Sequence, residues 1–397
     1  MQYRINPKNG DALSILAFGC MRFAKEESEV ERQIIYAIEQ GINYFDTAYI
    51  YPNSETTLGK ILAKGYRDRV HIATKLPHYL LKKPEDFERY FHEHLRRLQT
   101  HYIDYYLIHM LSDVGVWQRL KNLGIENWIK EKKAKGQIRN IGFSYHGGKE
   151  DFVKLIDAYD WEFCMIQYNY MDETNQAGRS GLEYASCKGL PVMIMEPLRG
   201  GKLVTSLPKE VEELWQQAQP KRSPAEWALR WVWNHPQVTT VLSGMNTMEM
   251  LQENIKAASQ ARALEFTEVE NTLFQKVREI LLRTIRVPCT GCNYCMPCPF
   301  GVDIPLCLAC SNDVVLEGRF TAIRKYIMQT GIKKKDSHAS LCTECGLCEA
   351  KCPQHIAIRK ELRVTQKELE GFWYKPARWV IKQYMGFHAK DQGGKRV

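Results

Sequence analysis

Four polar side chains in the first third of the chain are of the types that assist the reduction of a carbonyl group by hydride. Tyr51 is a candidate proton donor, although an unperturbed tyrosine, with a pKa near 10, donates poorly at neutral pH. A neighbouring ammonium such as Lys75 stabilises the phenolate and lowers that pKa, and Asp46 can hold Lys75 charged and oriented. His109 can donate a hydrogen bond to the substrate oxygen. Each has an ordinary structural explanation when taken singly, but together they predict reduction of a carbonyl or oxidation of the matching alcohol.

A second chemistry is carried by cysteines, since ten of the thirteen lie between Cys289 and Cys352. Eight of the ten form two runs with two- or three-residue spacings, and each run ends in Cys-Pro. Structural zinc also uses pairs of cysteines two residues apart, but three consecutive two-residue spacings exceed what one loop normally gives a tetrahedral ion. The pattern therefore favours iron–sulfur clusters. The predicted ligands are Cys289, Cys292, Cys295, Cys298, Cys342, Cys345, Cys348 and Cys352.

The crossing pattern of two-cluster ferredoxins predicts how these ligands are shared. There, the first three cysteines of a run hold one [4Fe–4S] cluster and the fourth holds the other. This assigns Cys352 to the cluster of the first run and Cys298 to the cluster of the second. Two residues separate Cys298 from Cys295, whereas three are usual at this point of the motif. A site that uses Cys307 or Cys310 as a ligand therefore stays open. The alternative for those two is that they are buried thiols of a helical insert.

The remaining sequence must supply elements that position these groups. Its 397 residues are 44% hydrophobic and 25% charged, an ordinary globular composition. Eight short β-branched or aromatic runs alternate with amphipathic segments such as 28–40, 85–98 and 125–135, which predicts a (β/α)8 barrel. A hairpin around Asn9-Gly10 could close its bottom. The expected strands are 15–20, 42–46, 70–75, 103–109, 138–144, 163–167, 192–195 and 239–242.

Changes in composition predict three parts. Residues 1–285 form the α/β barrel, whose last helix lies within 267–283. Residues 286–360 form a mainly α-helical ferredoxin-like iron–sulfur domain, with a helical insert at 320–329 between the cysteine runs. Residues 361–397 form a basic, aromatic tail.

Three motifs resemble the signatures of the aldo-keto reductase family, over roughly residues 1 to 260. They are GINYFDTAYIY at 41–51, the lone lysine after IAT at 72–74, and LIH at 107–109. The resemblance implies that Tyr51 is the general acid/base, that Lys75 and Asp46 tune it, and that His109 orients the carbonyl. It also implies that NAD(P)H lies extended across the barrel mouth. The cofactor positions so implied are Asp46, Ser144, Gln167, Ser243, Gly244, Met245, Glu253 and Asn254.

Three positions depart from the family pattern. Tyr145 stands where an asparagine often grips the carboxamide, and Met195 where a tyrosine stacks on the nicotinamide. Met250 stands in place of the arginine that holds the adenosine 2′-phosphate, so a bidentate cation is missing there. NADH is therefore expected to bind at least as well as NADPH, and the mouth leaves room for FMN. Arg199, in a glycine-rich loop, is a further candidate for phosphate binding.

Charge and hydropathy limit the partners. From residue 359 to the end there are ten Lys or Arg and four Asp or Glu, so this segment carries +6 of the formal +9, which argues against a nucleic-acid-binding protein. No apolar run is long enough to span a membrane, and we expect a cytoplasmic protein with a redox partner. The tail is expected to cover the cluster domain, because Trp373, Tyr374, Trp379 and Tyr384 need burial.

Two functions remain. The first is an NAD(P)H-dependent carbonyl reductase fused to an electron-transfer domain. The second is a flavin- or partner-dependent electron-transfer protein whose barrel binds nucleotide without classical carbonyl reduction. Turnover of a carbonyl substrate would separate them.

Overall fold

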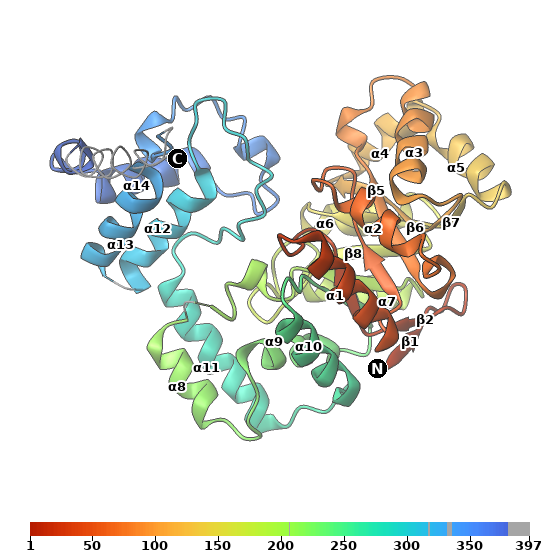
Figure 1. The fold of residues 1–397 in the computed structure, drawn as a ribbon, viewed down its shortest axis with the longest axis horizontal. Helices are drawn as coiled ribbons and strands as arrows, with labels where there is room; N and C mark the ends of the chain where they lie inside the picture. The colour runs from red at the N-terminus through yellow and green to blue at the C-terminus, as the bar shows by residue number, and fades with distance from the viewer. Residues whose placement is uncertain (206, 317, 332–335, 380–397) are drawn as a thin grey trace, which may run out of the picture. The chain divides into compact units, whose positions relative to one another are not determined.

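The computed structural model describes residues 1–205, 207–316, 318–331 and 336–379 (Figure 1). The chain folds into two compact units, one of Met1–Arg199 and Gln219–Asn271, the other of Gly200–Ala218 and the chain from Thr272 onward. Trp215 and Phe274 help to join the two segments of the second unit, with ring centroids 5.4 Å apart. The second unit thus includes a segment from within the barrel region as well as the chain from residue 272, and the domain limits predicted at 286 and 361 stay predictions.

Eight parallel strands close into a barrel in the first unit, in the order β10-β3-β4-β5-β6-β7-β8-β9. The predicted (β/α)8 architecture is confirmed, with strand limits within three residues of those expected. The strands are β3 (Leu16–Gly19), β4 (Tyr44–Asp46), β5 (His71–Leu76), β6 (Ile103–Leu111), β7 (Ile138–Tyr145), β8 (Phe163–Gln167), β9 (Val192–Met195) and β10 (Val238–Ser243).

Helices of the first unit cover this barrel, and α3 shows why such segments are helical. Its first turn carries three acidic residues and its last turn carries Arg96 and Arg97, which suits the helix dipole. Phe87, Phe91 and Leu98 are buried at four- and seven-residue spacing. The helices are α1 (Glu27–Glu39), α2 (Ser54–Leu62), α3 (Glu85–Leu98), α4 (Val114–Asn122), α5 (Ile125–Ala134), α6 (Lys149–Asp157), α7 (Gly178–Cys187), α9 (Pro224–Trp233) and α10 (Met248–Gln260).

One glycine decides how closely two of these helices approach. A Cβ at Gly59 of α2 would lie 2.4 Å from the carbonyl oxygen of Arg97 and 2.7 Å from the Cα of Leu98. Only glycine therefore fits there. The contact brings α2, which follows Tyr51, against the end of α3.

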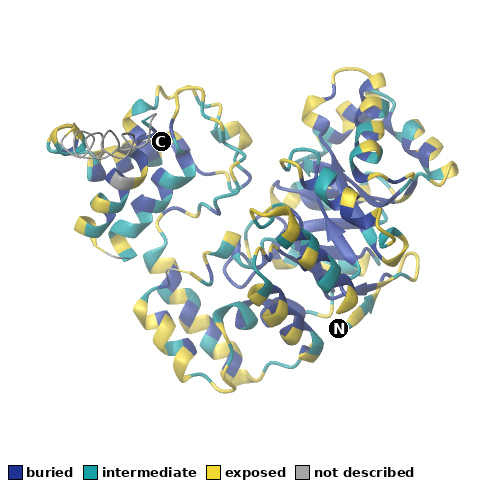
Figure 2. Cartoon of the chain, in the orientation of Figure 1, coloured by how far each residue is buried: buried dark blue, intermediate teal, exposed yellow. Residues whose placement is uncertain are grey.

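The barrel interior and its lower end are closed by side chains and by a hairpin. Figure 2 shows the strands as buried. The antiparallel pair β1 (Tyr3–Ile5) and β2 (Ala12–Ser14) forms as predicted and packs beside β10. Arg4 donates to the carbonyl oxygens of Trp233, His235 and Val238, which fixes the hairpin across the bottom.

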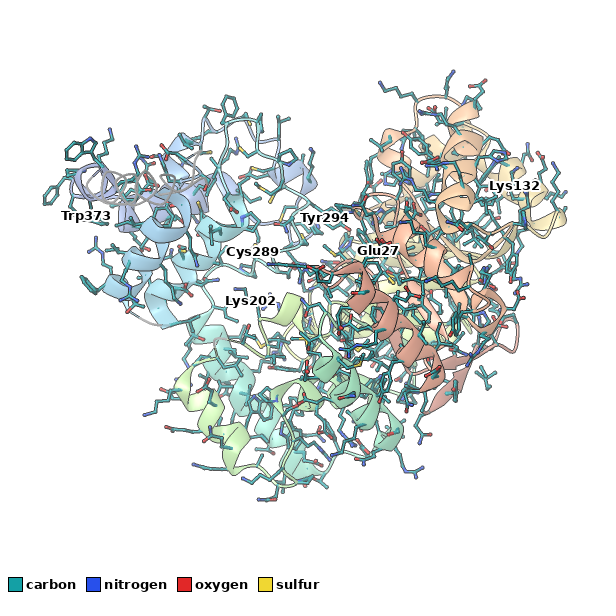
Figure 3. The ribbon with its side chains drawn as sticks, viewed as in Figure 1. Glu27, Lys132, Lys202, Cys289, Tyr294 and Trp373 are labelled. Atoms are coloured by element: carbon teal, nitrogen blue, oxygen red, sulfur yellow. The ribbon has the colours of Figure 1, made fainter. Side chains whose placement is uncertain are left out.

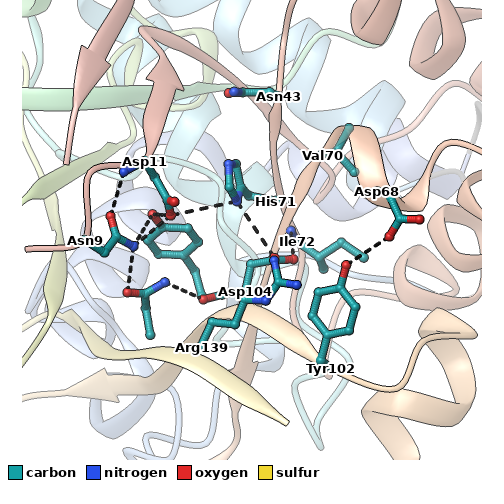
Figure 4. A network of polar contacts seen from close by, with 12 residues as sticks. Asn9, Asp11, Asn43, Asp68, Val70, His71, Ile72, Tyr102, Asp104 and Arg139 are labelled. Carbon is teal, nitrogen blue, oxygen red and sulfur yellow. Dashed lines mark hydrogen bonds and ion pairs between the residues drawn. The ribbon is translucent and has the colours of Figure 1, made fainter. Parts of the chain in front are cut away.

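A buried carboxylate organises the same end of the barrel (Figure 4). Asp104, whose side chain is 1% exposed, accepts hydrogen bonds from Arg67 (2.7 Å), Arg139 (2.9 Å) and the backbone N–H of Ile72 (2.9 Å). Burial by itself would raise the pKa of Asp104, but nearby His71 and the Arg67 guanidinium outweigh it and hold the pKa below its ordinary value. The ionised form is the one that the fold stabilises.

We expect Asp104→Asn to lower the free energy of unfolding by about 2–4 kcal/mol at pH 7, because it leaves Arg67 buried without its counter-charge. A carboxyl with a lowered folded-state pKa contributes stability above its unfolded pKa of about 4 and loses it as pH falls through the folded-state value. Urea denaturation between pH 3 and 7 should therefore show the difference between wild type and variant shrinking toward pH 3. A difference independent of pH would contradict this account.

The second unit is mainly helical around the cysteine-rich loops. Its helices are α8 (Lys209–Gln217), α11 (Glu268–Thr284, which begins in the first unit), α12 (Ile304–Leu316), α13 (Arg319–Tyr326) and α14 (Ile358–Leu369), with a π-helical turn at Ile327–Gly331. The 320–329 insert is helical as predicted, but the sequence analysis missed α12 and α14. An apolar core joins α12, α13 and α14 through residues such as Leu308, Tyr326 and Leu362.

The tail is only partly buried. Tyr374 is 2% exposed, and Ala377 packs on the same core one helical turn later. Trp379 is 65% exposed, so its predicted burial is wrong, because it lies on a different face of the 374–379 helical run. Tyr384 lies outside the described residues. Within the described part of the chain, no helix combines the length and apolarity needed to cross a membrane.

Candidate functional site

Three neighbouring strands bring the four candidate catalytic residues together at their carboxyl ends. Asp46 ends β4, Lys75 is next to last in β5, and His109 lies near the end of β6. The Lys75 Nζ lies 2.6 Å from Asp46 Oδ1 and 5.1 Å from the ring centroid of Tyr51. The rings of Tyr51 and His109 lie edge to face with centroids 6.5 Å apart. A phenol, an ammonium and an imidazole thus converge at one end of the barrel.

Burial sets the electrostatics of this group. Asp46 and Lys75 are both less than 6% exposed, and the ammonium also donates to the carbonyl oxygen of Thr47 (2.7 Å). Burial raises the pKa of Asp46, and the Lys75 ammonium opposes part of that rise. Burial, reinforced by the charge of Lys75, lowers the pKa of His109 well below its ordinary value. His109 is therefore a neutral hydrogen-bonding group at pH 7 rather than a cation.

The loop that carries Tyr51 is held at both ends. The backbone N–H of Tyr51 donates to Ala48 O (3.0 Å), and that of Ser54 donates to Tyr51 O (3.2 Å). Arg97 of α3 donates to Tyr49 O (3.1 Å) and lies 4.2 Å from the centroid of the Tyr49 ring. The position of the phenol thus depends on α3 as well as on its own loop.

A buried carboxylate that the sequence analysis missed links this loop to β5. Glu55 accepts from Thr74 Oγ1 (2.6 Å), contacts His94 Nδ1 (2.5 Å) and pairs with Arg97 (3.3 Å). Burial opposes its ionisation, but His94, Thr74 and Arg97 together hold its pKa below the ordinary value. Thr74 precedes Lys75, so the network joins the segments that carry the phenol and the ammonium. The available signal in the sequence was a glutamate four residues after Tyr51, together with the histidines of the segment that forms α3.

The predicted cofactor residues on β7 and β8 make polar contacts near the four candidate catalytic residues. Ser144 Oγ accepts from the backbone N–H of Met110 (2.8 Å), which follows His109 and has a φ of 58°. Gln167 donates to Asp172 (2.8 Å), and Arg199 pairs with the same carboxylate at 3.1 Å. The positive charge of Arg199 is therefore already matched by Asp172, a residue that the sequence analysis did not single out.

The remaining predicted cofactor residues follow β10. Asn254 of α10 donates to Ser243 Oγ (3.2 Å), and both are buried. Gly244 follows Ser243, and a Cβ there would lie 4.0 Å from the carbonyl oxygen of Gly19. Met245 is fully buried, and Glu253 is exposed. Asn254 and Ser243 thus come together, whereas Glu253 lies on the outer face of α10.

The beginning of α10 is capped from within the protein. Thr247 Oγ1 accepts from the backbone N–H of Met250 (3.3 Å). The side-chain oxygen of buried Gln33, with its amide in the favoured orientation, accepts from the N–H groups of Thr247 and Met248 (3.2 Å each). Glu249 adds a negative charge to the first turn. The amides at this helix start are therefore already bonded, a feature that the sequence did not reveal.

The three departures from the family pattern are placed as follows. The hydroxyl of Tyr145 donates to Gly148 O, and its ring packs on Phe152 at 4.8 Å. Met195 packs against the apolar interior of the barrel, and Met250 is 46% exposed. Tyr145 therefore turns into its own loop rather than standing as a polar group beside Ser144.

The eight predicted cluster cysteines line two hollows in the second unit, whose side chains Figure 3 draws, with Cys289 and Tyr294 labelled. Among the described residues, no three His, Cys, Asp or Glu side chains gather closely enough to hold a single metal ion. Burial and neighbouring thiols raise the pKa of Cys295 to about 12. The cysteines that line one hollow are Cys289, Cys292, Cys295 and Cys352. Those that line the other are Cys295, Cys298, Cys342, Cys345 and Cys348.

Cys307 and Cys310 lie elsewhere. Both are buried in α12, where the thiol of Cys307 lies 3.6 Å from Ser337 O and that of Cys310 lies 3.8 Å from Gln329 Oε1. Neither lines either hollow.

Comparison with known proteins identifies both parts. Residues 15–273 match the model of the aldo/keto reductase family. The chain belongs to this family. Residues 288–357 match a 4Fe-4S dicluster domain, so this aldo/keto reductase-type oxidoreductase carries an iron–sulfur domain.

The relatives cover roughly two thirds of this chain. Protein tas of Escherichia coli is 27% identical over 322 residues, which are 65% of this chain and 93% of that protein. The NADH-specific methylglyoxal reductase of Escherichia coli is 23% identical and covers 63% of this chain and 87% of its own length. The holo form of aldo-keto reductase AKR11C1 from Bacillus halodurans superposes with a TM-score of 0.59 at 26% identity, covering 70% of this chain and 96% of that one.

Proposed function

We propose that this aldo/keto reductase transfers hydride from NAD(P)H to a small carbonyl substrate, or from the matching alcohol in reverse, with Tyr51 as the proton donor. The observation that carries the proposal is the Lys75 ammonium, which lies 5.1 Å from the Tyr51 ring and is fixed by Asp46 at 2.6 Å. A cation held this close stabilises the phenolate that proton donation leaves behind.

Each side chain has a separate task in the proposed reaction. Neutral His109 donates a hydrogen bond to the carbonyl oxygen, which orients the carbonyl and increases the positive character of its carbon. Bound NAD(P)H supplies a hydride to that carbon. Tyr51 passes its proton to the oxygen, so the C=O bond becomes a C–H and an O–H bond. Lys75 balances the charge on the Tyr51 oxygen until the proton is replaced from water.

The barrel mouth has donor and acceptor groups suited to a nicotinamide nucleotide. Asp46 Oδ2 is buried and has no hydrogen-bond partner among the described residues, so it can accept a ribose hydroxyl. Ser144 and Gln167 supply further polar groups at the ends of β7 and β8. Met195 offers an apolar surface to a flat ring, which also leaves FMN as an alternative occupant.

Replacing Tyr51 by phenylalanine tests the proposed activity. The variant should lose carbonyl reduction by ~10²-fold or more, because the proton donor is gone, and should bind NADH as the wild type does. Tyr79→Phe is the matched control, since Tyr79 also borders His109, at 6.2 Å. A wild-type rate in Tyr51→Phe, or loss in the control instead, would refute the proposed role of Tyr51.

We expect the protein to bind NADH at least as tightly as NADPH. Met250 offers no charge to a 2′-phosphate, Glu249 repels it, and Gln33 and Thr247 already bond the amides at the start of α10. One relative, which is 23% identical, is named an NADH-specific methylglyoxal reductase, and this supports the expectation. Dissociation constants from fluorescence titration should show NADH binding at least as tightly as NADPH, and Met250→Arg should improve NADPH alone. A ~100-fold preference of the wild type for NADPH would mean that Arg199 exchanges Asp172 for the phosphate.

We propose further that the second unit holds two redox-active [4Fe–4S] clusters. One hollow is lined by three cysteines of the first run and by Cys352, and the other by three cysteines of the second run, Cys298 and also Cys295. This grouping supports the crossing pattern of two-cluster ferredoxins. We assign Cys289, Cys292, Cys295 and Cys352 to one cluster and Cys342, Cys345, Cys348 and Cys298 to the other. A reducing cytoplasm suits such thiolate ligands, and a partner protein would exchange electrons with them.

A second candidate function follows from the iron–sulfur match. The barrel would bind nucleotide without reducing a carbonyl, and the protein would pass electrons between a flavin and a partner. Absence of turnover with any carbonyl, together with reversible bleaching of the clusters, would favour it.

A further inference from the structure

The hollow that includes Cys298 and the second cysteine run opens at the surface of the protein. Cys345 is exposed, whereas none of the four cysteines proposed for the other cluster is. Beside it, Leu347 is 56% exposed and Phe300 is 46% exposed. Both side chains line the hollow. One cluster position therefore reaches the surface beneath two large apolar side chains.

The charged side chains in the lining of this hollow are cations. The charged side chains that line the hollow are Lys351 and Arg359, and no carboxylate is among the described residues lining it. The nearby carboxylates are paired, Glu349 with Arg359 at 2.7 Å and Glu344 with Arg363 at 3.5 Å. The charge of Arg359 is thus matched by Glu349, and a partner that approaches Phe300 and Leu347 meets Lys351, for which the described residues provide no ion-pair partner.

An apolar centre with a charged rim is the usual form of a transient protein interface, and weak electron-transfer contacts lie at the small end of interface sizes. Complementary charge speeds such encounters and selects the partner. The other hollow differs, because no Lys or Arg is among the described residues that line it.

We propose that the face formed by Phe300, Leu347, Lys351 and Arg359 is the docking site of an acidic flavoprotein that exchanges single electrons with the cluster of Cys298, Cys342, Cys345 and Cys348. The inference rests on the proposed iron–sulfur function. One electron leaves the reduced cluster, which returns to its oxidised level. The oxidised flavin gains that electron and one proton from water and becomes the neutral semiquinone.

The test uses the full-length protein, purified without oxygen, reduced with dithionite and freed of excess reductant. Stopped-flow mixing with oxidised flavodoxin, an acidic FMN protein, gives a second-order rate constant, and cytochrome c serves as a basic acceptor. Leu347→Glu and Lys351→Glu should each lower the rate with flavodoxin by ~10-fold or more, and rising salt should slow the wild type. Phe320→Glu is the matched control, because Phe320 lies on α13 and is 83% exposed. Its rate should stay at the wild-type value.

Several results would overturn the docking site. They are equal rates in the wild type and both variants, an equal loss in the Phe320 control, or a similar loss with cytochrome c. A change of oligomeric state in Leu347→Glu, seen by sedimentation, would instead make the face a contact between copies of this chain. If Leu347→Glu loses iron, Lys351→Glu and Phe300→Glu decide the matter. A wild type without iron, or one that dithionite does not bleach, would refute the iron–sulfur function itself.

Discussion

Replacing Lys75 by methionine should lower the rate of carbonyl reduction by ~10²-fold or more while the fold and the iron content survive. Methionine keeps the length and apolar stem of the side chain but removes the charge that stabilises the Tyr51 phenolate. It also leaves Asp46 buried without its cation, a carboxyl whose pKa burial already raises. The protonated acid is the form that burial favours in the variant, so it need not unfold. Steady-state kcat with NADH, next to thermal unfolding, measures both effects.

Lys132→Met is the matched control for this substitution. Its side chain is 4% exposed and its Nζ lies 2.6 Å from Glu88, whose side chain is 40% exposed, so the substitution also removes a buried lysine from an ion pair. It lies on α5, away from the four residues at the strand ends. The control should cost stability and leave kcat unchanged. If Lys75→Met kept a near-normal kcat, or if both variants lost activity in step with stability, the chemistry would not depend on this ammonium.

The sequence was enough to predict the barrel because its strands are buried and its helices amphipathic. The run from Ile103 to His109 reads as a strand, and β6 begins at Ile103 and extends two residues further, to Leu111. In contrast, α12 was missed because the polar residues of Ile304–Leu316 follow one another at 311–313, so its apolar residues show little helical period. Helix α14 is strongly amphipathic, but the sequence analysis assigned most of it to the tail because the segment from residue 359 onward is basic.

The candidate site also has one part that the sequence predicts and another that it does not. Spacing along the chain predicts that Asp46, Lys75 and His109 meet, since neighbouring parallel strands end at one edge of a barrel. No spacing rule predicts that Glu55 of α2 meets His94 and Arg97 of α3, or that Asp172 takes up the charge of Arg199. These contacts join helices and loops whose approach is set by packing, as at Gly59.

NADH alone should leave the visible spectrum of the clusters unchanged in the anaerobic protein, although dithionite or a reduced flavoprotein should bleach it. Nicotinamide gives up two electrons as a hydride, whereas a [4Fe–4S] cluster accepts one, so direct exchange would pass through a high-energy nicotinamide radical. A flavin can accept a hydride and release electrons singly, and it must stand between them. We favour a flavin on a partner protein, because the Tyr51, Lys75 and His109 arrangement suits direct hydride transfer to a carbonyl.

The control for this experiment is the composition of the preparation. Two cubanes require about eight iron atoms and eight sulfides per chain, and about four would mean that the short spacing before Cys298 has cost one cluster. Extracted flavin must be measured as well, since FMN bound in the barrel would allow NADH to bleach the clusters by the same two-step route. Rapid bleaching by NADH in a protein shown to hold no flavin is the one outcome that a separate mediator does not permit. It would require an electron path from the barrel to the cysteine-rich unit that bypasses flavin altogether.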